Sequence, residues 1–589
     1  MKFIRQFDNI QVTANVDMEI ELEQRQSEAG IVEYCFAFCW NEEQAKDPKA
    51  MMKIEWKLPC VDVQYMWHPN TRARRVLDGN WRMGFSSMMT VSAPMGVLFN
   101  GSDENVYTFA TDEVRRVSSV HMGVEDGDNT ACVQVKLGLQ QFVGRSSHRM
   151  TVRADYRKIP MHRAMADVCK WWDEVLPGEA LPVPEIARLP MYSSWYSYHQ
   201  AISAEELEAE CRLAAEMNMH AIIVDDGWQC EDVHQGYGYT GDWEVCEKKI
   251  PYMREHVRKV HEAGLKYILW YSVPYVGYHS KAWQRFKDCI LYRVDRSSCG
   301  VLDPRYPQVR DYLISTYENA VQEFDLDGFK LDFVDRFVAQ PDSVIKPGMD
   351  YTCVQEATER LMTDVVSRLK ALKPEILIEF RQSYIGPMMR RFGNMFRVGD
   401  CAMDIASNRI GTVDLRLLSG NTACHSDMIC WGYDESAEDA ALQLLNAMFG
   451  VIQFSMIIKD LNPEHRRMAK FWLNFAQENR MVLQLSELIP LEPYFLYPVV
   501  EARGGEESII GVYARDKIVH VPVQQKRIQL MNATKDAYVT LCFAENDEAD
   551  VAIRNVLGEN VRNERVHFSK GLNVLEVPRS GLLEMTFER

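Results

Sequence analysis

Hydrophobic and polar residues alternate with the two-residue period of β-strands along the first 160 residues. The segment from Val16 to Glu23 alternates strictly, and the runs 51–58 and 95–99 lie between Asp-Gly, Pro and Asn-Gly turn signals. Short strands with this spacing are typical of a β-sandwich. A helical segment at 161–176 follows, with prolines at 177, 182, 184 and 190. We therefore predict an N-terminal sandwich over residues 1–160 and a helical, proline-rich linker over 161–187.

From residue 188 to residue 482 the pattern changes to alternating strands and helices. The helical segment 352–372, for example, carries a stripe of Val354, Ala357, Leu361, Val365 and Leu369. Eight runs read as buried strands: 189–195, 220–226, 265–273, 329–334, 375–380, 395–398, 422–429 and 451–458. Eight alternations over roughly 290 residues favour a (β/α)8 barrel over a doubly wound sheet. No glycine-rich phosphate loop follows any of these runs, which also argues against a nucleotide-binding sheet.

The last part of the chain, residues 483–589, returns to short alternating strands such as 509–513, 518–523, 538–543 and 572–577. These predict a second, antiparallel β-sandwich. The expected fold is therefore multidomain, α/β plus β: a central (β/α)8 barrel flanked by an N-terminal and a C-terminal sandwich.

Charge and cysteine usage exclude several classes of partner and site. The 589-residue chain has 66 Lys and Arg against 84 Asp and Glu, a net charge of −18. This acidity disfavours nucleic acid and anionic membrane surfaces but not a neutral sugar. No apolar run approaches the roughly 20 residues that span a bilayer. The 15 cysteines lie mostly in apolar runs without zinc-ribbon spacing, which predicts reduced thiols in a cytoplasmic protein.

Polar and aromatic residues gather where seven of the eight predicted barrel strands end. Barrel enzymes carry their catalytic groups at these carboxyl ends. In chain order the strand ends hold Ser194, Trp195 and Tyr196; Asp225, Asp226 and Trp228; Trp270 and Tyr271; Lys330 and Asp332; Glu379 and Arg381; Arg397 and Asp400; His425 and Asp427. Aromatic faces stack on sugar rings, and cleavage of a glycosidic bond requires two carboxyl groups. The combination predicts a sugar-binding active site.

Each of these signals also has a structural alternative. Asp226-Gly227 is a common turn dipeptide. Lys330 and Asp332 lie on one strand face, where an ion pair is the structural alternative, but the cost of burying both charges favours a functional role. Asp400 and Asp404 are both candidates to cap the helix that follows. The strand ends show no His-x-His or His-x-x-x-His spacing, and no Ser lies in a Gly-x-Ser-x-Gly elbow. We therefore predict no metal, no other cofactor and no serine nucleophile.

The order of these motifs is more specific than any single one. Ser194-Trp195, Asp225-Asp226-Gly227-Trp228, Lys330-x-Asp332 and Arg397-Val398-Gly399-Asp400 follow one another along the barrel. This order resembles the α-galactosidase clan, most closely glycoside hydrolase family 36 with its raffinose-synthase-like relatives. The flanking sandwiches fit the three-part layout of that family.

The resemblance implies a role for several residues. It makes Asp332 the nucleophile and Asp400 the general acid/base, and it assigns Asp225 and Asp226 to the O4 and O6 hydroxyls of a terminal galactose. Lys330 and Trp270 would line the same subsite. Arg397 is similar to the arginine that often precedes the acid/base, and the segment 423–426, with His425, is similar to the family's Gly-x-His-x segment.

Three departures from the family leave alternatives open. Gly399 stands where the family usually has Ser before the acid/base, and Asp404 follows four residues later, so either Asp400 or Asp404 is the acid. The stretch 379–382, with Glu379 and Arg381, replaces the Cys- and Gly-rich stretch that approaches O2. This leaves the identity of the sugar open. The N-terminal sandwich is also shorter than is usual in the family.

The sequence thus predicts a retaining exo-α-glycosidase, in the first place an α-galactosidase. The alternatives are a galactosyl-transferring transglycosylase, a related α-glycosidase with another sugar preference, and a non-catalytic carbohydrate-binding protein on the same scaffold. The expected partner is a small sugar substrate, with neither nucleic acid nor membrane. A homo-oligomer is left open.

Overall fold

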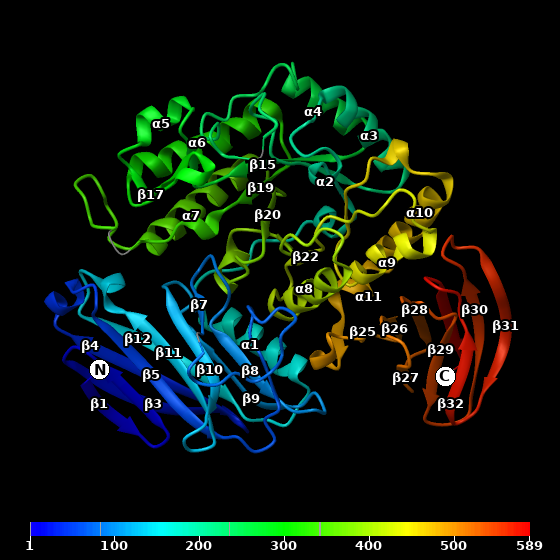
Figure 1. Cartoon of the computed structure of the whole chain (residues 1–589), viewed down its shortest axis with the longest axis horizontal. Coiled ribbons are helices and arrows are strands. Elements are labelled where there is room, and N and C mark those ends of the chain that lie inside the picture. The colour runs from blue at the N-terminus through cyan, green and yellow to red at the C-terminus, as the bar shows by residue number, and fades with distance from the viewer. Residues whose placement is uncertain (1, 83, 235, 341–342, 589) are drawn as a thin grey trace.

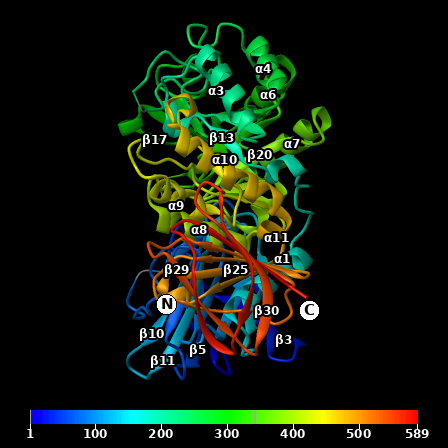
Figure 2. The same cartoon turned by 90° about the vertical axis from the view of Figure 1, so that its right-hand side faces the viewer.

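The computed structural model describes residues 2–82, 84–234, 236–340 and 343–588. Figure 1 shows an N-terminal pair of β-sheets and C-terminal β-sheets lying on the same side of a central α/β barrel. Turned by 90°, the molecule shows the C-terminal sheets in front of the N-terminal ones, with the barrel above both (Figure 2). A parallel eight-stranded sheet between largely antiparallel sheets confirms the predicted fold class.

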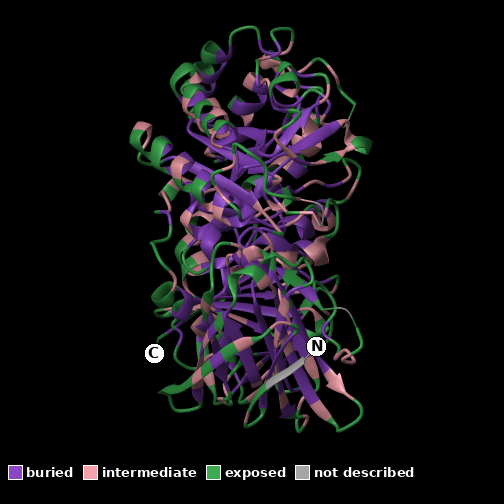
Figure 3. Cartoon of the chain, turned by 90° about the vertical axis from the view of Figure 1, so that its left-hand side faces the viewer, coloured by how far each residue is buried: buried purple, intermediate pink, exposed green. Residues whose placement is uncertain are grey.

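The N-terminal part is a sandwich of two six-stranded antiparallel sheets, in the orders β1-β2-β5-β11-β10-β7 and β3-β4-β12-β9-β8-β6. Its strands are β1 (Lys2–Phe7), β2 (Ile10–Ala14), β3 (Met18–Glu28), β4 (Ile31–Trp40), β5 (Met51–Pro59), β6 (Tyr65–Trp67), β7 (Phe85–Ser87), β8 (Met95–Phe99), β9 (Asn105–Thr111), β10 (Ser118–Glu125), β11 (Thr130–Gly138) and β12 (Ser147–Asp155). Buried and half-buried residues alternate along β5, because one face of each sheet packs on the other sheet. Figure 3 shows the resulting buried layer between the two sheets.

A helix, α1 (Met161–Val175), connects this sandwich to the barrel. Its buried face includes Met165, Val168 and Trp172, which belong to the same apolar cluster as the barrel core. The indole of Trp172 donates to the carbonyl oxygen of Thr111 at 2.9 Å. The helix is therefore packed into the molecule on both sides.

The barrel has one strand in each of the eight predicted runs. These are β13 (Met191–Ser193), β14 (Ala221–Val224), β15 (Lys266–Ser272), β19 (Gly328–Asp332), β20 (Leu377–Arg381), β21 (Met395–Arg397), β22 (Ala423–His425) and β23 (Gln453–Phe454). They form one parallel sheet in the order β22-β21-β20-β19-β15-β14-β13-β23. Isolated parallel bridges, His425 to Val451 and Ile429 to Phe454, bring its two edges together and nearly close the barrel. All eight strand predictions are confirmed.

Helices alternate with these strands around the outside of the barrel. They are α2 (Trp195–Tyr198), α3 (Ala204–Glu216), α4 (Met253–Glu262), α5 (Lys281–Phe286), α6 (Pro307–Phe324), α7 (Val354–Leu372), α8 (Ile405–Leu418), α9 (Ala437–Ala447) and α10 (Pro463–Glu478). Helices α3 and α10 begin at side-chain caps. The Ser203 hydroxyl accepts from the Glu206 amide, and Asn462 caps α10 with Pro463 as its first residue.

Between β15 and α6 the chain inserts a small antiparallel sheet that the alternation pattern did not predict. Its strands are β16 (Tyr275–Gly277), β17 (Ile290–Val294) and β18 (Cys299–Leu302). Three short strands interrupted by turns carry too few residues to show a clear period.

After α10, a short helix, α11 (Arg480–Leu485), leads to the C-terminal sheets, so the predicted boundary at residue 482 falls within that helix. One sheet has seven strands in the order β24-β25-β26-β28-β33-β30-β31 and the other has three, β27-β29-β32. The strands are β24 (Glu487–Leu491), β25 (Val499–Gly504), β26 (Glu507–Val512), β27 (Ile518–His520), β28 (Arg527–Asn532), β29 (Tyr538–Phe543), β30 (Asp547–Arg554), β31 (Asn560–Phe568), β32 (Gly571–Glu576) and β33 (Leu582–Phe587). Their inner faces enclose a separate apolar cluster that includes Ile528, Leu541 and Leu583.

Candidate active site

Asp332 is the last residue of β19 and is almost fully buried at the carboxyl end of the barrel. Its Oδ1 accepts from Arg381 Nε, the Tyr384 hydroxyl and the Phe333 amide, each at 2.8 Å. Its Oδ2 accepts from the indole nitrogen of Trp270 at 3.1 Å. Burial alone would raise the pKa of Asp332, but the charges of Arg381 and Lys330 and these hydrogen bonds outweigh it and hold the pKa well below its ordinary value. Asp332 is therefore an ionised carboxylate.

Lys330 lies two residues before Asp332 and forms a buried ion pair with Asp225 at the end of β14. The backbone amide of Asp225 in turn donates to the hydroxyl of Ser194, at the end of β13, at 3.0 Å. The ends of β13, β14 and β19 are thus tied together at one end of the barrel, across the intervening β15. The charge of Lys330 acts on two carboxylates there, because it pairs with Asp225 and also lowers the pKa of Asp332.

Asp226 has neutral partners where Asp225 has a cation. Its two carboxylate oxygens accept from the side-chain amides of Gln200 at 2.6 Å and Gln229 at 2.7 Å. Burial without a paired cation raises the pKa of Asp226 to about 6. The predicted Asp-Asp pair is therefore two electrostatically different carboxyl groups.

The three predicted tryptophans occupy different positions. Trp270 contacts Asp332 directly, whereas Trp228 is fully buried and its indole donates to the Trp270 carbonyl oxygen at 2.9 Å. Trp228 also stacks on Trp243, so its contacts are those of a supporting side chain. Trp195 begins α2 and is half-buried, with its ring edge-on to His199.

Asp400 follows β21 in a loop, and its side chain is 61% exposed. Its Oδ1 lies 2.9 Å from a terminal nitrogen of Arg397. Partial burial raises the pKa of Asp400, but Arg397, Lys330 and Arg381 more than offset this and the net pKa is below the ordinary value. Asp332 and Asp400 therefore lie at the same end of the barrel, and Arg381 and Lys330 influence both.

Asp404 has the alternative role that the sequence left open. It is the N-cap of α8: its side chain accepts from the Ser407 amide at 3.0 Å and from the Ser407 hydroxyl at 2.6 Å. This cap accounts for both carboxylate oxygens, which favours Asp400 as the acid/base.

Arg397 connects Asp400 to the buried interior of the barrel. Besides Asp400, its guanidinium contacts Asp427 after β22, and its Nε lies 3.7 Å from Glu379. Asp427 also accepts from the Tyr196 hydroxyl at 2.9 Å and from the amide of Cys401 at 2.6 Å. Since Cys401 is the neighbour of Asp400, Asp427 helps to position the loop that carries the acid/base candidate.

Glu379 and His425 lie inside the barrel and are fully buried. The amide of Gln453 contacts both of them, and the second ring nitrogen of His425 bonds to the carbonyl oxygen of Ala187 at 2.8 Å. Burial lowers the pKa of His425 to about 3, so the ring is neutral. The structure therefore places these two predicted substrate-binding residues in the buried interior of the barrel, Glu379 in register with Lys330 and His425 in register with Arg397.

A cavity of about 710 Å³ opens at this end of the barrel. One wall contains Arg381, Asp400 and the loop 382–385, and the other is the segment 69–73 of the N-terminal sandwich with Ser92. The two walls come from parts of the chain more than 250 positions apart.

Sequence reasoning missed Tyr384, Gln200 and Gln229. Tyr384 lies three residues beyond the end of β20, and the two glutamines lie in loops. None of the three stands directly at a strand end, so only the tertiary contacts identify them.

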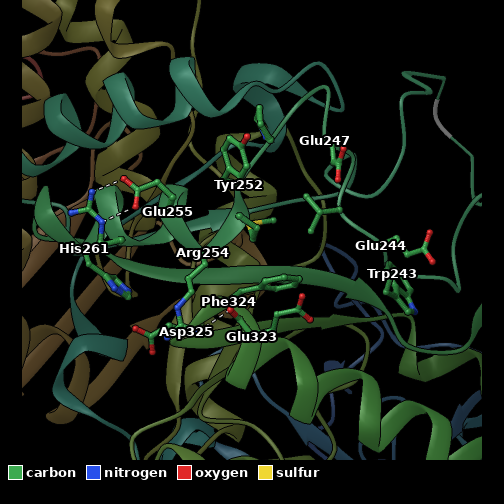
Figure 4. A pocket seen from close by; sticks show the side chains of 14 residues that line it. Trp243, Glu244, Glu247, Tyr252, Arg254, Glu255, His261, Glu323, Phe324 and Asp325 are labelled. Atoms are coloured by element: carbon green, nitrogen blue, oxygen red, sulfur yellow. Dashed lines mark hydrogen bonds and ion pairs between the residues drawn. The ribbon is translucent and has the colours of Figure 1, made fainter.

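A larger cavity, of about 1180 Å³, lies elsewhere, on the outside of the barrel between α4 and the end of α6. Figure 4 shows Tyr252, Glu255, Glu323 and Asp325 among the side chains around it. None of its lining residues is one of the predicted site residues.

The described residues show neither a metal-binding cluster nor a membrane-spanning helix. Over the described ranges, no group of three or more His, Cys, Asp or Glu side chains is arranged to hold a metal ion. Likewise, none of the helices in the described parts of the chain combines the length and apolarity of a membrane span.

Comparison with known proteins bears on the barrel. Residues 188–405, which hold Asp225, Asp332 and Asp400, match the family model Melibiase. This segment is similar to the melibiase family. The resemblance to the α-galactosidases of glycoside hydrolase family 36 is thereby confirmed for this segment.

Curated relatives of this chain are α-galactosidases by name. Alpha-galactosidase 2 of Pediococcus pentosaceus is 27% identical over 204 residues, 33% of this chain and 28% of the relative. Alpha-galactosidase AgaA of Geobacillus stearothermophilus is 25% identical over 200 residues, 32% of this chain and 26% of the relative. The chain thus spans less than a third of the length of either relative.

Solved structures extend the similarity of fold to the whole chain. AgaA in complex with raffinose superposes with a TM-score of 0.65 at 15% identity, covering 100% of this chain and 84% of that one. The α-galactosidase of Lactobacillus brevis superposes with a TM-score of 0.64 at 15% identity, covering 99% and 82%. The sandwiches as well as the barrel therefore share the arrangement of these proteins.

Proposed function

We propose that the protein is a retaining exo-α-galactosidase that removes terminal α-linked galactose by double displacement. The observation that carries the proposal is the environment of Asp332: an ionised carboxylate at the end of β19, with Lys330 and Arg381 beside it and Asp400 at the same end of the barrel. Retaining glycosidases require this pair of a nucleophile and an acid/base. The names of the relatives support galactose as the sugar.

In the first step Asp332 attacks the anomeric carbon while Asp400 donates a proton to the departing glycosidic oxygen. Asp400 is ionised in the open site, because Arg397 and other cations lower its pKa. A bound aglycone covers this exposed carboxyl and removes water from it, which raises its pKa and favours the protonated form. In the second step Asp400 deprotonates the water that opens the glycosyl ester.

The remaining residues bind or support the sugar. Asp225 and Asp226 accept hydrogen bonds from the sugar hydroxyls. Lys330 and Trp270 lie in the same subsite. Arg381 and Arg397 lie next to the two reacting carboxylates. Trp195 is half-buried at the barrel end and available for stacking. Trp228 supports Trp270, and Glu379 together with His425 supports Arg397, all three as buried side chains.

A panel of 4-nitrophenyl α- and β-glycosides, including arabinopyranoside and N-acetylgalactosaminide, tests the reaction and the sugar. We expect turnover of the α-galactoside, a loss of at least about 10⁴-fold in Asp332→Ala, and net retention of anomeric configuration by proton NMR. Wild-type protein that hydrolyses none of the panel, or an Asp332→Ala variant as active as the wild type, contradicts the proposal.

Transfer to a sugar acceptor is the second candidate function. The cavity of about 710 Å³ next to Asp400 is large enough for an acceptor sugar. Product analysis at high acceptor concentration separates transfer from hydrolysis: a new galactoside as main product favours transfer, and free galactose favours hydrolysis.

Two further outcomes would point to other functions. A protein that binds galactose but cleaves no glycoside would be a binding protein on this scaffold. Loss of activity with EDTA would indicate a metal-dependent hydrolase.

We also propose a cytoplasmic location, because all 15 cysteines are free thiols. Fractionation of the producing cell tests it, and recovery from the extracellular fraction would contradict it. Sedimentation of the purified chain distinguishes a monomer from a homo-oligomer.

A further inference from the structure

The two oxygens of Asp332 have unequal surroundings. Oδ1 accepts three hydrogen bonds, from Arg381, Tyr384 and the Phe333 amide, whereas Oδ2 accepts one, from Trp270. A carboxylate oxygen has about two lone-pair sites, so Oδ1 is saturated and Oδ2 retains one for a new bond. The site therefore distinguishes the two oxygens before any substrate binds.

Tyr384 has a fixed orientation beside the carboxylate. It is fully buried, its hydroxyl oxygen accepts from the Phe333 amide at 3.2 Å, and its hydrogen is directed to Asp332 Oδ1. The guanidinium of Arg381 lies over the rings of Phe333 and Tyr384. The hydroxyl is thus preorganised, which is the condition under which a hydrogen-bond donor contributes to catalysis.

The N-terminal sandwich holds the loop that supplies Tyr384. The Ser92 amide donates to the Ser383 carbonyl oxygen at 2.7 Å. At Gly386 the two backbones approach so closely that an added Cβ would lie 2.7 Å from the Met89 carbonyl oxygen and 3.1 Å from that of Ser92. Only a residue without a Cβ lets the loop lie this close to the sandwich.

We propose that Tyr384, held in place by the N-terminal sandwich, is a further catalytic residue that stabilises the Asp332 carboxylate when it leaves the glycosyl ester. The inference rests on the proposed double displacement. In the first step Oδ2 bonds to the anomeric carbon, the bond from that carbon to the glycosidic oxygen breaks, and the leaving oxygen takes its electron pair and the proton of Asp400. Oδ1 then becomes the carbonyl oxygen of the ester.

In the second step water attacks the anomeric carbon and gives a proton to Asp400, while the bond from carbon to Oδ2 breaks and its electrons return to the carboxylate. Negative charge reappears on Oδ1, where Tyr384 and Arg381 donate. A donor at this position favours departure of the carboxylate more than its attack, because the ester carries less charge on Oδ1 than the carboxylate does.

Tyr384→Phe therefore slows the second step selectively. With 4-nitrophenyl α-galactoside we expect kcat to fall about 10-fold, since Arg381 and the Phe333 amide remain on Oδ1, and KM to fall by a similar factor, so that kcat/KM changes less than about 3-fold. The glycosyl-enzyme accumulates, and stopped-flow absorbance shows a burst of nitrophenol that the wild type lacks.

Tyr192→Phe is the matched control. Tyr192 is also fully buried and hydrogen-bonded through its hydroxyl, but to Ser197 and the Met456 carbonyl oxygen. We expect wild-type kcat and KM in this variant. Wild-type kinetics in Tyr384→Phe, or an equal fall of kcat and kcat/KM without a burst, would overturn the proposal.

A second variant tests the contribution of the sandwich and serves if Tyr384→Phe fails to fold. Gly386 has an ordinary φ of −58°, so Gly386→Ala is opposed only by the close backbone and should displace the loop, giving the same burst with a smaller amplitude. Absence of a burst in this folded variant argues against the role of the sandwich. An inactive wild type would refute the double displacement itself. The role of Tyr384 alone would be refuted if the wild type is active, Asp332→Ala is inactive and Tyr384→Phe has unaltered kinetics.

Discussion

At the scale of single residues, the partners of each buried carboxylate determine its charge. Asp332 and Asp226 are both nearly inaccessible to water, yet cations lower the pKa of the first and neutral amides leave that of the second at about 6. Two aspartates of similar burial thus serve different purposes, one as a permanent anion and one as a group that titrates near neutral pH.

Asp226→Asn should change the dependence of stability on pH. The pKa of Asp226 is about 6 in the folded protein, against an ordinary value of 3.8, so the folded state binds more protons between these values. The free energy of unfolding of the wild type therefore falls as pH rises through this window, by at most about 3 kcal/mol from this group. The Asn variant lacks this contribution. Urea unfolding measured at pH 4 and at pH 7 should show a smaller decrease in the free energy of unfolding for the variant than for the wild type. Equal decreases in the two proteins would contradict the raised pKa of Asp226.

At the scale of elements, two aspartates near the start of α8 have different roles. Asp400 lies in the loop before the helix and contacts Arg397, whereas Asp404 caps the first turn. The sequence places both before a helix and cannot decide between them, because a capping position and a catalytic loop position use the same residue type.

Asp404→Ala should destabilise the protein by about 1 kcal/mol through loss of the cap and leave activity within about 2-fold of the wild type. Asp404→Asn keeps a capping oxygen and should recover most of that stability. Asp400→Ala should instead lower kcat for a poor leaving group by at least about 10²-fold. Thermal unfolding and steady-state kinetics measure both effects, and the reverse pattern of activities would make Asp404 the acid/base.

At the scale of the whole molecule, one buried carboxylate joins the three parts of the chain. Asp414 of α8 accepts from Trp67 and Arg75 of the N-terminal part and from the Tyr497 hydroxyl near the C-terminal sheets, at 3.1, 3.1 and 2.7 Å. All four side chains are buried. Because α8 follows the Asp400 loop, this junction also fixes the helix on which the loop depends.

Asp414→Ala should cost about 3–5 kcal/mol of folding free energy, since it leaves the Arg75 charge buried without its partner. Glu559→Ala, which removes an exposed ion pair with Arg467, is the control and should have little effect. Urea or thermal unfolding measures both. A loss in Asp414→Ala no larger than in the control would show that the junction contributes little.

The sequence by itself determined the eight strand–helix alternations, the sandwiches at each end and the strand-end positions of Asp225, Lys330, Asp332 and Arg397. Periodicity, caps and turn dipeptides act over a few residues, so they can be read locally. Which face each side chain takes, and which distant loop meets it, depends on packing between segments. For that reason only the tertiary structure showed that Glu379 and His425 are fully buried, that Asp404 caps a helix, and that Tyr384 contacts the carboxylate of Asp332.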